Sequence, residues 1–169
     1  MKTIFRTYQF ELQPTQEQKT LLDKHFGCVR YVFNHFLNER KEQYQVDKKS
    51  DNYYAQAATL TELKKKEETV WLKEVNSQSL QFALRCLDTA YVNFFRGNAK
   101  FPRFKSKKNK NTFTVPQFAK LENDRFYAPK FKEGIKVNVH REVKGEVGKC
   151  TLSKKPTGKY FVSILSEEQ

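Results

Sequence analysis

The sequence predicts an α+β fold, in which a small antiparallel β-barrel is interrupted by an insertion of four helices. Residues 1–12 alternate between apolar and polar as a strand does, and residues 13–98 have the periodicity of amphipathic helices. After residue 110 the chain returns to short alternating segments. Because a lone first strand cannot satisfy its backbone groups, we expect it to pair with the late strands in one barrel.

The first strand has one apolar face, which Arg6 interrupts and which comprises Ile4, Tyr8, Phe10 and Leu12. A helix opens at Pro14 and Thr15, and a second helix follows and extends to about residue 45. Gly27 lies between the two apolar stripes and predicts a tight junction or a close helix approach there. Two helices around a glycine are also compatible with a DNA-reading helix-turn-helix, although many helical hairpins share this pattern.

Two further helices complete the insertion. Asp51 or Asn52 caps the third helix, which ends near Trp71, and Asn76 or Ser77 caps the fourth. The fourth helix has an apolar stripe and a stop sequence, formed by Leu80, Leu84, Leu87, Tyr91, Phe94, Gly97 and Asn98. Four short strands are then predicted, over residues 125–131, 135–140, 147–153 and 159–165.

The charge is concentrated in the second half of the chain. The 169 residues carry a net charge of +13, and residues 98–169 hold seventeen cations and seven acids, a net charge of +10. An excess of this size indicates a polyanionic partner, most simply nucleic acid, with an anionic membrane surface as the alternative. No apolar run is long enough to span a bilayer, and 15 Phe with 8 Tyr predict a packed core.

The segment FPRFKSKKNKN, residues 101–111, is the sharpest local signal. It holds no acid, and Pro102 lies between two phenylalanines that can anchor the segment by packing or stack on a base. The cations that can face phosphates include Arg103, Lys105, Lys107 and Lys108. A lysine-rich segment can equally be a solvated loop. Upstream, Arg30, Asn34, Asn38 and Arg40 present hydrogen-bond donors from one helix.

No catalytic or metal-binding pattern stands out. The three cysteines lack paired CxxC spacing, the three histidines lack ligand spacing, and the six glycines form no phosphate-binding loop. Reduced and mostly buried thiols in a cytoplasmic, nucleoid-associated protein are the expected state of the cysteines.

Together, VRYVFNHFL, LTELKKKEETVWLKEVNSQSLQFALRCLDTAYVNFF and FPRFKSKK resemble the TnpB family, the OrfB proteins of bacterial insertion sequences. This transposase family is related to type V CRISPR effectors and acts as an RNA-guided DNA endonuclease. The resemblance covers the N-terminal half of such a protein. It implies an oligonucleotide-binding-like wedge barrel, residues 1–12 and 99–169, and a helical recognition domain, residues 13–98, with a helix-turn-helix-like start.

The resemblance also implies partners and site residues. Guide RNA and double-stranded DNA are the expected partners. The residues that fall at the family's DNA contacts are Tyr53, Ser77, Gln81, Thr114 and Gln117. The residues expected to meet RNA are Arg6, Arg30, Asn34, Arg103, Lys105, Lys107 and Lys108.

The family's RuvC-like nuclease has no counterpart in this sequence. No catalytic residue, metal or other cofactor is therefore expected in this chain, with Mg and Zn confined to the missing C-terminal domains. Three functions stay open: a binding module of an RNA-guided endonuclease or its nuclease-dead short form, a stand-alone helix-turn-helix DNA-binding repressor, and a nuclease half that another chain completes.

Overall fold

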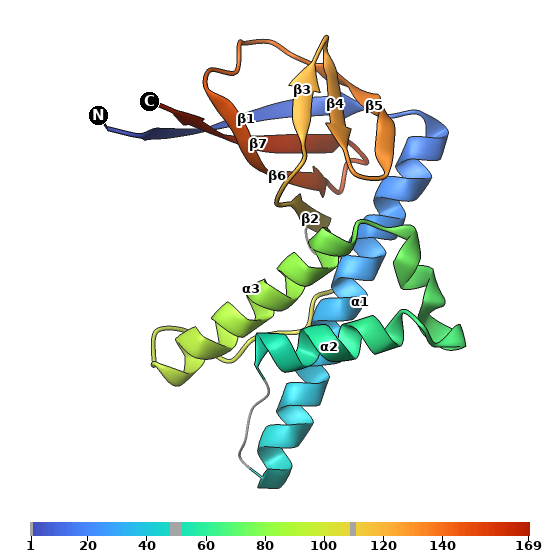
Figure 1. Ribbon diagram of the computed structural model, residues 1–169, viewed down its shortest axis with the longest axis vertical. Helices are drawn as coiled ribbons and strands as arrows, with labels where there is room; N and C mark the ends of the chain where they lie inside the picture. The colour runs from blue at the N-terminus through green and yellow to red at the C-terminus, as the bar shows by residue number, and fades with distance from the viewer. Residues whose placement is uncertain (1, 48–51, 109–110) are drawn as a thin grey trace. The chain divides into compact units, whose positions relative to one another are not determined.

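The computed structural model describes residues 2–47, 52–108 and 111–169. Its elements form an α+β fold in the order β1 (Ile4–Gln13), α1 (Gln16–Asp47), α2 (Tyr53–Leu63), the 3-10 helix η1 (Glu67–Glu74), α3 (Ser77–Phe95), β2 (Asn111–Val115), β3 (Lys120–Glu122), β4 (Arg125–Ala128), β5 (Phe131–Asn138), β6 (Glu146–Lys154) and β7 (Tyr160–Glu168) (Figure 1). The chain divides into two compact units. Unit 1 comprises residues 1–26 and 107–169, and unit 2 comprises residues 27–106.

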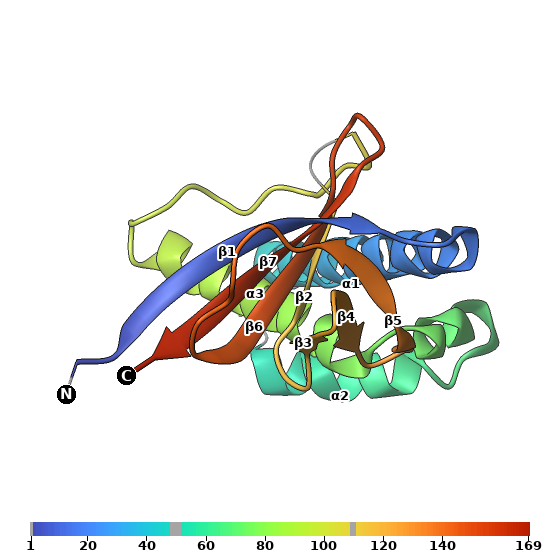
Figure 2. The same cartoon turned by 90° about the horizontal axis from the view of Figure 1, so that it is seen from above.

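Unit 1 contains a seven-stranded antiparallel sheet with the strand order β2-β6-β7-β1-β5-β4-β3. Strand β1 lies inside the sheet, where Tyr8 is opposite Ile164 of β7 and Leu12 is opposite Val137 of β5 (Figure 2). The prediction that the first strand pairs with the late strands is therefore confirmed. Burial follows the predicted face, since Tyr8, Phe10 and Leu12 are buried while Ile4 at the free end is exposed.

The sheet is not a closed barrel, because no described residue of β2 pairs with β3 at the two edges. The predicted strand over residues 125–131 is also wrong in detail. It is divided by a turn at which Lys130 has a φ of 76°, and the chain then reverses into β5. Strands β2 and β3 were not predicted because segments of five and three residues are too short for an alternating pattern to stand out.

A capping box opens α1. The Thr15 hydroxyl accepts a hydrogen bond from the backbone N–H of Gln18 at 3.2 Å, and the Gln18 side chain accepts one from the Thr15 N–H at 3.0 Å. The Gln18 amide also donates to the carbonyl of Gly134 at 2.9 Å, which ties the start of the helix to β5 of the same unit. The predicted helix start at Thr15 is confirmed.

Helix α1 runs without a break from Gln16 to Asp47, so the predicted junction at Gly27 is wrong. The apolar stripe stays in phase across the glycine, with Leu22, Phe26, Val29 and Phe33 all buried. A single glycine weakens a helix without ending it when the flanking stripe continues to be buried. The described residues therefore contain no turn of a helix-turn-helix at this point.

In unit 2 both predicted asparagine caps are confirmed. The Asn52 side chain accepts a hydrogen bond from the N–H of Ala55, and the Asn76 side chain accepts one from the N–H of Gln78. The third helix ends earlier than predicted, at Leu63, and η1 follows it after the extended backbone of Lys66. The described helices are thus three α-helices and one 3-10 helix, and none of them is long and apolar enough to cross a membrane.

Candidate nucleic-acid interface

The part of the basic segment that lies in unit 2, residues 101–106, is fixed to α1 by the side chain of Asn34. The Asn34 carboxamide donates to the carbonyl of Lys105 at 2.8 Å and accepts from its backbone N–H at 2.7 Å. This pair of bonds copies the exchange between two strands of a sheet, so it sets both the position and the direction of the chain. Asn34 was predicted to contact RNA, and the structure engages its amide with the segment that carries the cations.

Aromatic rings hold the same segment from both sides of Pro102. The Phe101 ring meets the rings of Tyr91 and Phe94 edge-on, with centroids 5.4 and 5.2 Å away. The Lys105 ammonium lies 4.6 Å from the centroid of Phe33, while the side chains of Arg103 and Lys105 remain exposed. The segment is therefore built onto the helices, and its cations are presented from an ordered backbone. Lys110 lies outside the described residues.

We expect Asn34→Ala to release the segment. The substitution removes both bonds to Lys105, and net hydrogen bonds of this kind contribute about 0.5–1.5 kcal/mol each. The amide of Lys105 should therefore exchange with solvent at least several-fold faster, as measured by hydrogen–deuterium exchange. Asn38→Ala is the matched control, because the exposed Asn38 bonds only to Glu42, one turn further along α1, at 3.3 Å. Equal exchange at Lys105 in both variants would contradict the anchoring role.

A second cluster of cations lies at one end of the sheet in unit 1. Asn111, the first residue of β2, is paired with Lys154, the last residue of β6, so the start of β2 lies beside the β6–β7 turn. We call this set of cations the basic end of unit 1; it comprises Lys107, Lys108, Lys154, Lys155 and Lys159. The lysines of the β6–β7 turn were not singled out from the sequence, because their place beside the start of β2 depends on the strand register.

The basic end keeps its positive charge. Partial burial opposes the charge on Lys154, but hydrogen bonds and attraction involving Tyr160 and Asp23 outweigh burial and raise the pKa of this lysine. Lys155 lies 4.1 Å from the Phe161 ring centroid. Lys159 lies 3.6 Å from a carboxylate oxygen of Glu11. Lys154 and Lys159 thus have carboxylate neighbours in Asp23 and Glu11, and a cluster of lysines of this kind suits phosphate groups.

Helix α3 presents an exposed polar stripe in unit 2. Ser77, Gln81 and Arg85 follow one another at intervals of four residues and are all exposed. The Arg85 guanidinium carbon lies 4.2 Å from the centroid of the Tyr53 ring at the start of α2. Three of the predicted DNA contacts, Tyr53, Ser77 and Gln81, are thus brought onto one surface. Arg85 was missed, although its spacing from Gln81 was readable in the sequence.

Comparisons with known proteins show which proteins this chain is similar to. A family model described as a helix-turn-helix domain, HTH_OrfB_IS605, matches residues 1–49. The chain is 37% identical over 166 residues to InsQ of Escherichia coli K12, which is named as an RNA-guided DNA endonuclease. It is 35% identical over 173 residues to a protein of Streptomyces pristinaespiralis that is also named as an RNA-guided DNA endonuclease.

The chain matches the N-terminal half of TnpB/OrfB-family proteins.

These matches cover 97% and 99% of this chain but only 41% and 43% of the two relatives, so the chain spans less than half of their length and corresponds to the N-terminal half of TnpB. The virulence protein VsdF of Salmonella dublin is 35% identical over 108 residues, which cover 59% of this chain and 91% of that protein.

Other residues predicted from the TnpB resemblance lie in different settings. Thr114 is buried on β2, with its hydroxyl 3.3 Å from that of Thr151, whereas Gln117 is exposed in the following loop. Arg6 is exposed, and its side chain lies 3.9 Å from a carboxylate oxygen of Glu168. Arg30 is half-buried on α1. Of these four side chains, Gln117 and Arg6 have the clearest access to a partner.

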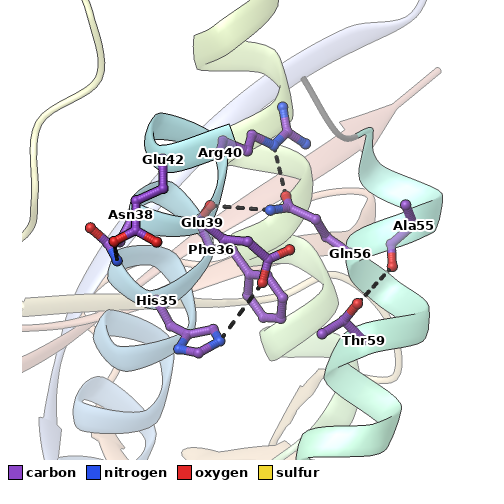
Figure 3. A network of polar contacts seen from close by, with 9 residues as sticks. All are labelled: His35, Phe36, Asn38, Glu39, Arg40, Glu42, Ala55, Gln56 and Thr59. Carbon is purple, nitrogen blue, oxygen red and sulfur yellow. Dashed lines mark hydrogen bonds and ion pairs between the residues drawn. The ribbon is translucent and has the colours of Figure 1, made fainter. Parts of the chain in front are cut away.

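Arg40 was predicted to present donors from the same helix as Asn34 and Asn38, and it directs them into the interior of unit 2. Its side chain is buried, and its Nε donates to Gln56 at 2.8 Å (Figure 3). Its Nη2 donates to Asp88, also at 2.8 Å. Gln56 in turn donates to the carbonyl of Phe36 at 3.1 Å. The guanidinium also lies 5.0 Å from the centroid of the Tyr91 ring. Arg40 therefore joins α1, α2 and α3 inside unit 2.

Within residues 2–47, 52–108 and 111–169, no three His, Cys, Asp or Glu side chains are grouped so that they could hold a metal ion. The three cysteines form no disulfide with one another. Burial raises the pKa of Cys150 to about 12, which makes its thiol a poor nucleophile at neutral pH.

Proposed function

We propose that this chain is the nucleic-acid-binding part of a TnpB-like RNA-guided DNA endonuclease. Unit 1 takes the place of the family's wedge and binds guide RNA at its basic end. Unit 2 takes the place of the recognition domain and contacts the DNA duplex beside the target through α3. We propose that the open sheet serves as the wedge barrel does in the family and that the protein acts at the nucleoid. We assign no cleavage step to these residues.

One observation carries the proposal most directly: the cations of the basic segment are displayed on a backbone that the protein ties down. The two bonds between Asn34 and Lys105 and the packing of Phe101 have no purpose in a solvated loop. Ordering the backbone before binding lowers the entropy lost when phosphates are contacted. The names of the two long relatives support RNA and DNA as the classes of partner.

The stripe on α3 supports the DNA part of the proposal. Ser77 and Gln81 offer a hydroxyl and a carboxamide, which contact base edges or donate hydrogen bonds to phosphates, and Arg85 adds a guanidinium. The Tyr53 ring below the Arg85 guanidinium restricts its orientation, as a cation–π contact does. The continuous helix α1 argues against the alternative of a stand-alone helix-turn-helix repressor.

Salt dependence tests the RNA part. Binding of a structured RNA, measured by fluorescence anisotropy between about 50 and 200 mM salt, should weaken steeply because each phosphate contact releases counterions. Lys107→Ala with Lys155→Ala should reduce the slope of log K against log salt by roughly 1–2, since each contact contributes about 0.7–0.9. A flat salt dependence in the unaltered protein would contradict the proposal.

Arg85→Ala is the matched change in unit 2. We expect it to weaken binding of duplex DNA and to leave the RNA slope unaltered. Nuclease treatment separates the alternative function, because a stand-alone repressor keeps its DNA affinity when RNA is digested, whereas an RNA-guided module loses it.

A further inference from the structure

The connection between β2 and β3 crosses the open seam of unit 1. These strands form opposite edges of the sheet, yet only residues 116–119 separate them in sequence (Figure 1). A chain advances at most about 3.6 Å per residue, so the Cα atoms of Val115 and Lys120 are within about 18 Å of each other. The sheet must therefore curl until its two edges approach, and residues 116–119 bridge the remaining gap.

Phe118 lies in this bridge in an unusual state. Its side chain is 74% exposed, and its φ is 68°, in the left-handed region that bulky residues avoid. The other non-glycine residues with positive φ among the described residues are Asn123, Asp124 and Lys130, of which the first two tolerate this region well. No contact of the Phe118 ring with another aromatic ring or with a cation is seen in the described parts of the chain. The fold therefore holds a largely exposed ring in a strained backbone conformation.

The neighbours of Phe118 have the chemistry of a single-strand contact. Gln117 is exposed and offers a carboxamide. Lys120 is exposed, with its ammonium 5.0 Å from the Tyr127 ring centroid and 3.3 Å from a carboxylate oxygen of Glu122. A ring for stacking, an amide for a base edge and a cation near the backbone are the parts from which single-strand sites are made.

We propose that Phe118 stacks on an unpaired base of the nucleic acid that unit 1 binds. The inference rests on the proposed function and adds a site to it. A nucleobase fits better than a protein partner, because protein interfaces need a contiguous apolar patch, and both neighbours in the bridge, Pro116 and Ala119, are half-buried. The net charge of +10 on residues 98–169 also favours a polyanion over a protein surface.

The test uses single-stranded 12-mers that carry one 2-aminopurine, because stacking on an aromatic ring quenches its fluorescence. With the unaltered full chain at low salt we expect quenching on binding. Phe118→Ala should abolish the quenching and weaken binding roughly tenfold, in line with about 1–3 kcal/mol for one stacked base. Phe118→Trp should retain both effects. DNA and RNA oligonucleotides are compared in parallel, and the one that is quenched identifies the source of the base.

Phe5→Ala is the matched control, because Phe5 is also an exposed phenylalanine of unit 1, at 62%, but lies on β1. It should bind and quench like the unaltered protein. If Phe118→Ala does so too, the stacking role is overturned while the proposed function stands. If the unaltered protein binds no oligonucleotide and no structured RNA, both are overturned.

The melting temperature supplies an independent readout. Glycine adopts positive φ without strain, so Phe118→Gly should melt at the same temperature as the unaltered protein or higher. A clear fall in the melting temperature would show that the ring is needed for packing, and would overturn the proposal.

Discussion

Asp88→Ala is expected to lower the free energy of unfolding by about 3–5 kcal/mol, the range found when one partner of a buried ion pair is removed. The Asp88 carboxylate accepts from Arg40 at 2.8 Å, and the Arg40 side chain is only 2% exposed while that of Asp88 is 32% exposed. Without Asp88, Arg40 keeps only its bond to Gln56 and its contact with Tyr91. A guanidinium cannot lose its charge, so it must stay buried without a counter-charge or pull the three helices apart. Denaturant unfolding measures the change.

Glu62→Ala is the control for this loss. It also removes one acid from an ion pair in unit 2, but Glu62 and its partner Lys65 are 66% and 64% exposed. Exposed pairs contribute little, so we expect a change within about 0.5 kcal/mol. Similar losses in Asp88→Ala and Glu62→Ala would contradict the idea that burial of Arg40 makes its pair important.

Stability should fall by about 3 kcal/mol between pH 6.5 and pH 4 because of His25. Its imidazole is buried between the rings of Phe113 and Phe131, with centroids 4.7 and 5.2 Å away, and Nδ1 donates to the Leu21 carbonyl at 2.8 Å. Burial, opposed by this hydrogen bond and assisted by the charge of Lys130, lowers the pKa of His25 from 6.5 to about 4. The unfolded chain therefore binds a proton before the folded chain does, and stability that is complete above pH 6.5 is lost as the pH falls to about 4.

His25→Phe separates this effect from the carboxylates that titrate in the same range. The phenylalanine ring fills the same space but takes up no proton, so the variant should lose much less stability over this interval. Chemical denaturation at a series of pH values provides the comparison. His35, whose pKa is also lowered by burial and by Lys66, contributes in the same direction in both proteins and cancels in the difference. Parallel curves for the two proteins would disprove the assignment to His25.

The features that were predictable from the sequence depend on neighbouring residues. Thr15, Asn52 and Asn76 cap helices because their side chains reach backbone groups within three residues. The place of β1 inside the sheet was also predictable, because an isolated strand leaves its backbone groups without partners.

The features that were missed depend on contacts between distant residues. The buried role of Arg40 was not predictable, because its partners Gln56 and Asp88 are 16 and 48 positions away in the sequence. Lys154 and Lys155 join the basic segment only through the pairing of β2 with β6. The junction predicted at Gly27 is absent because the buried stripe of α1 continues past the glycine.

The central position of β1 has a consequence for synthesis of the protein. This strand is synthesised long before its partner β7, so Tyr8 must wait for Ile164. Unit 2 is one continuous stretch, residues 27–106, and is complete long before that point. We therefore expect the nascent chain to contain a folded unit 2 while both edges of β1 are still unpaired. Such a state favours chaperone binding, and domain-swapped dimers when translation stalls.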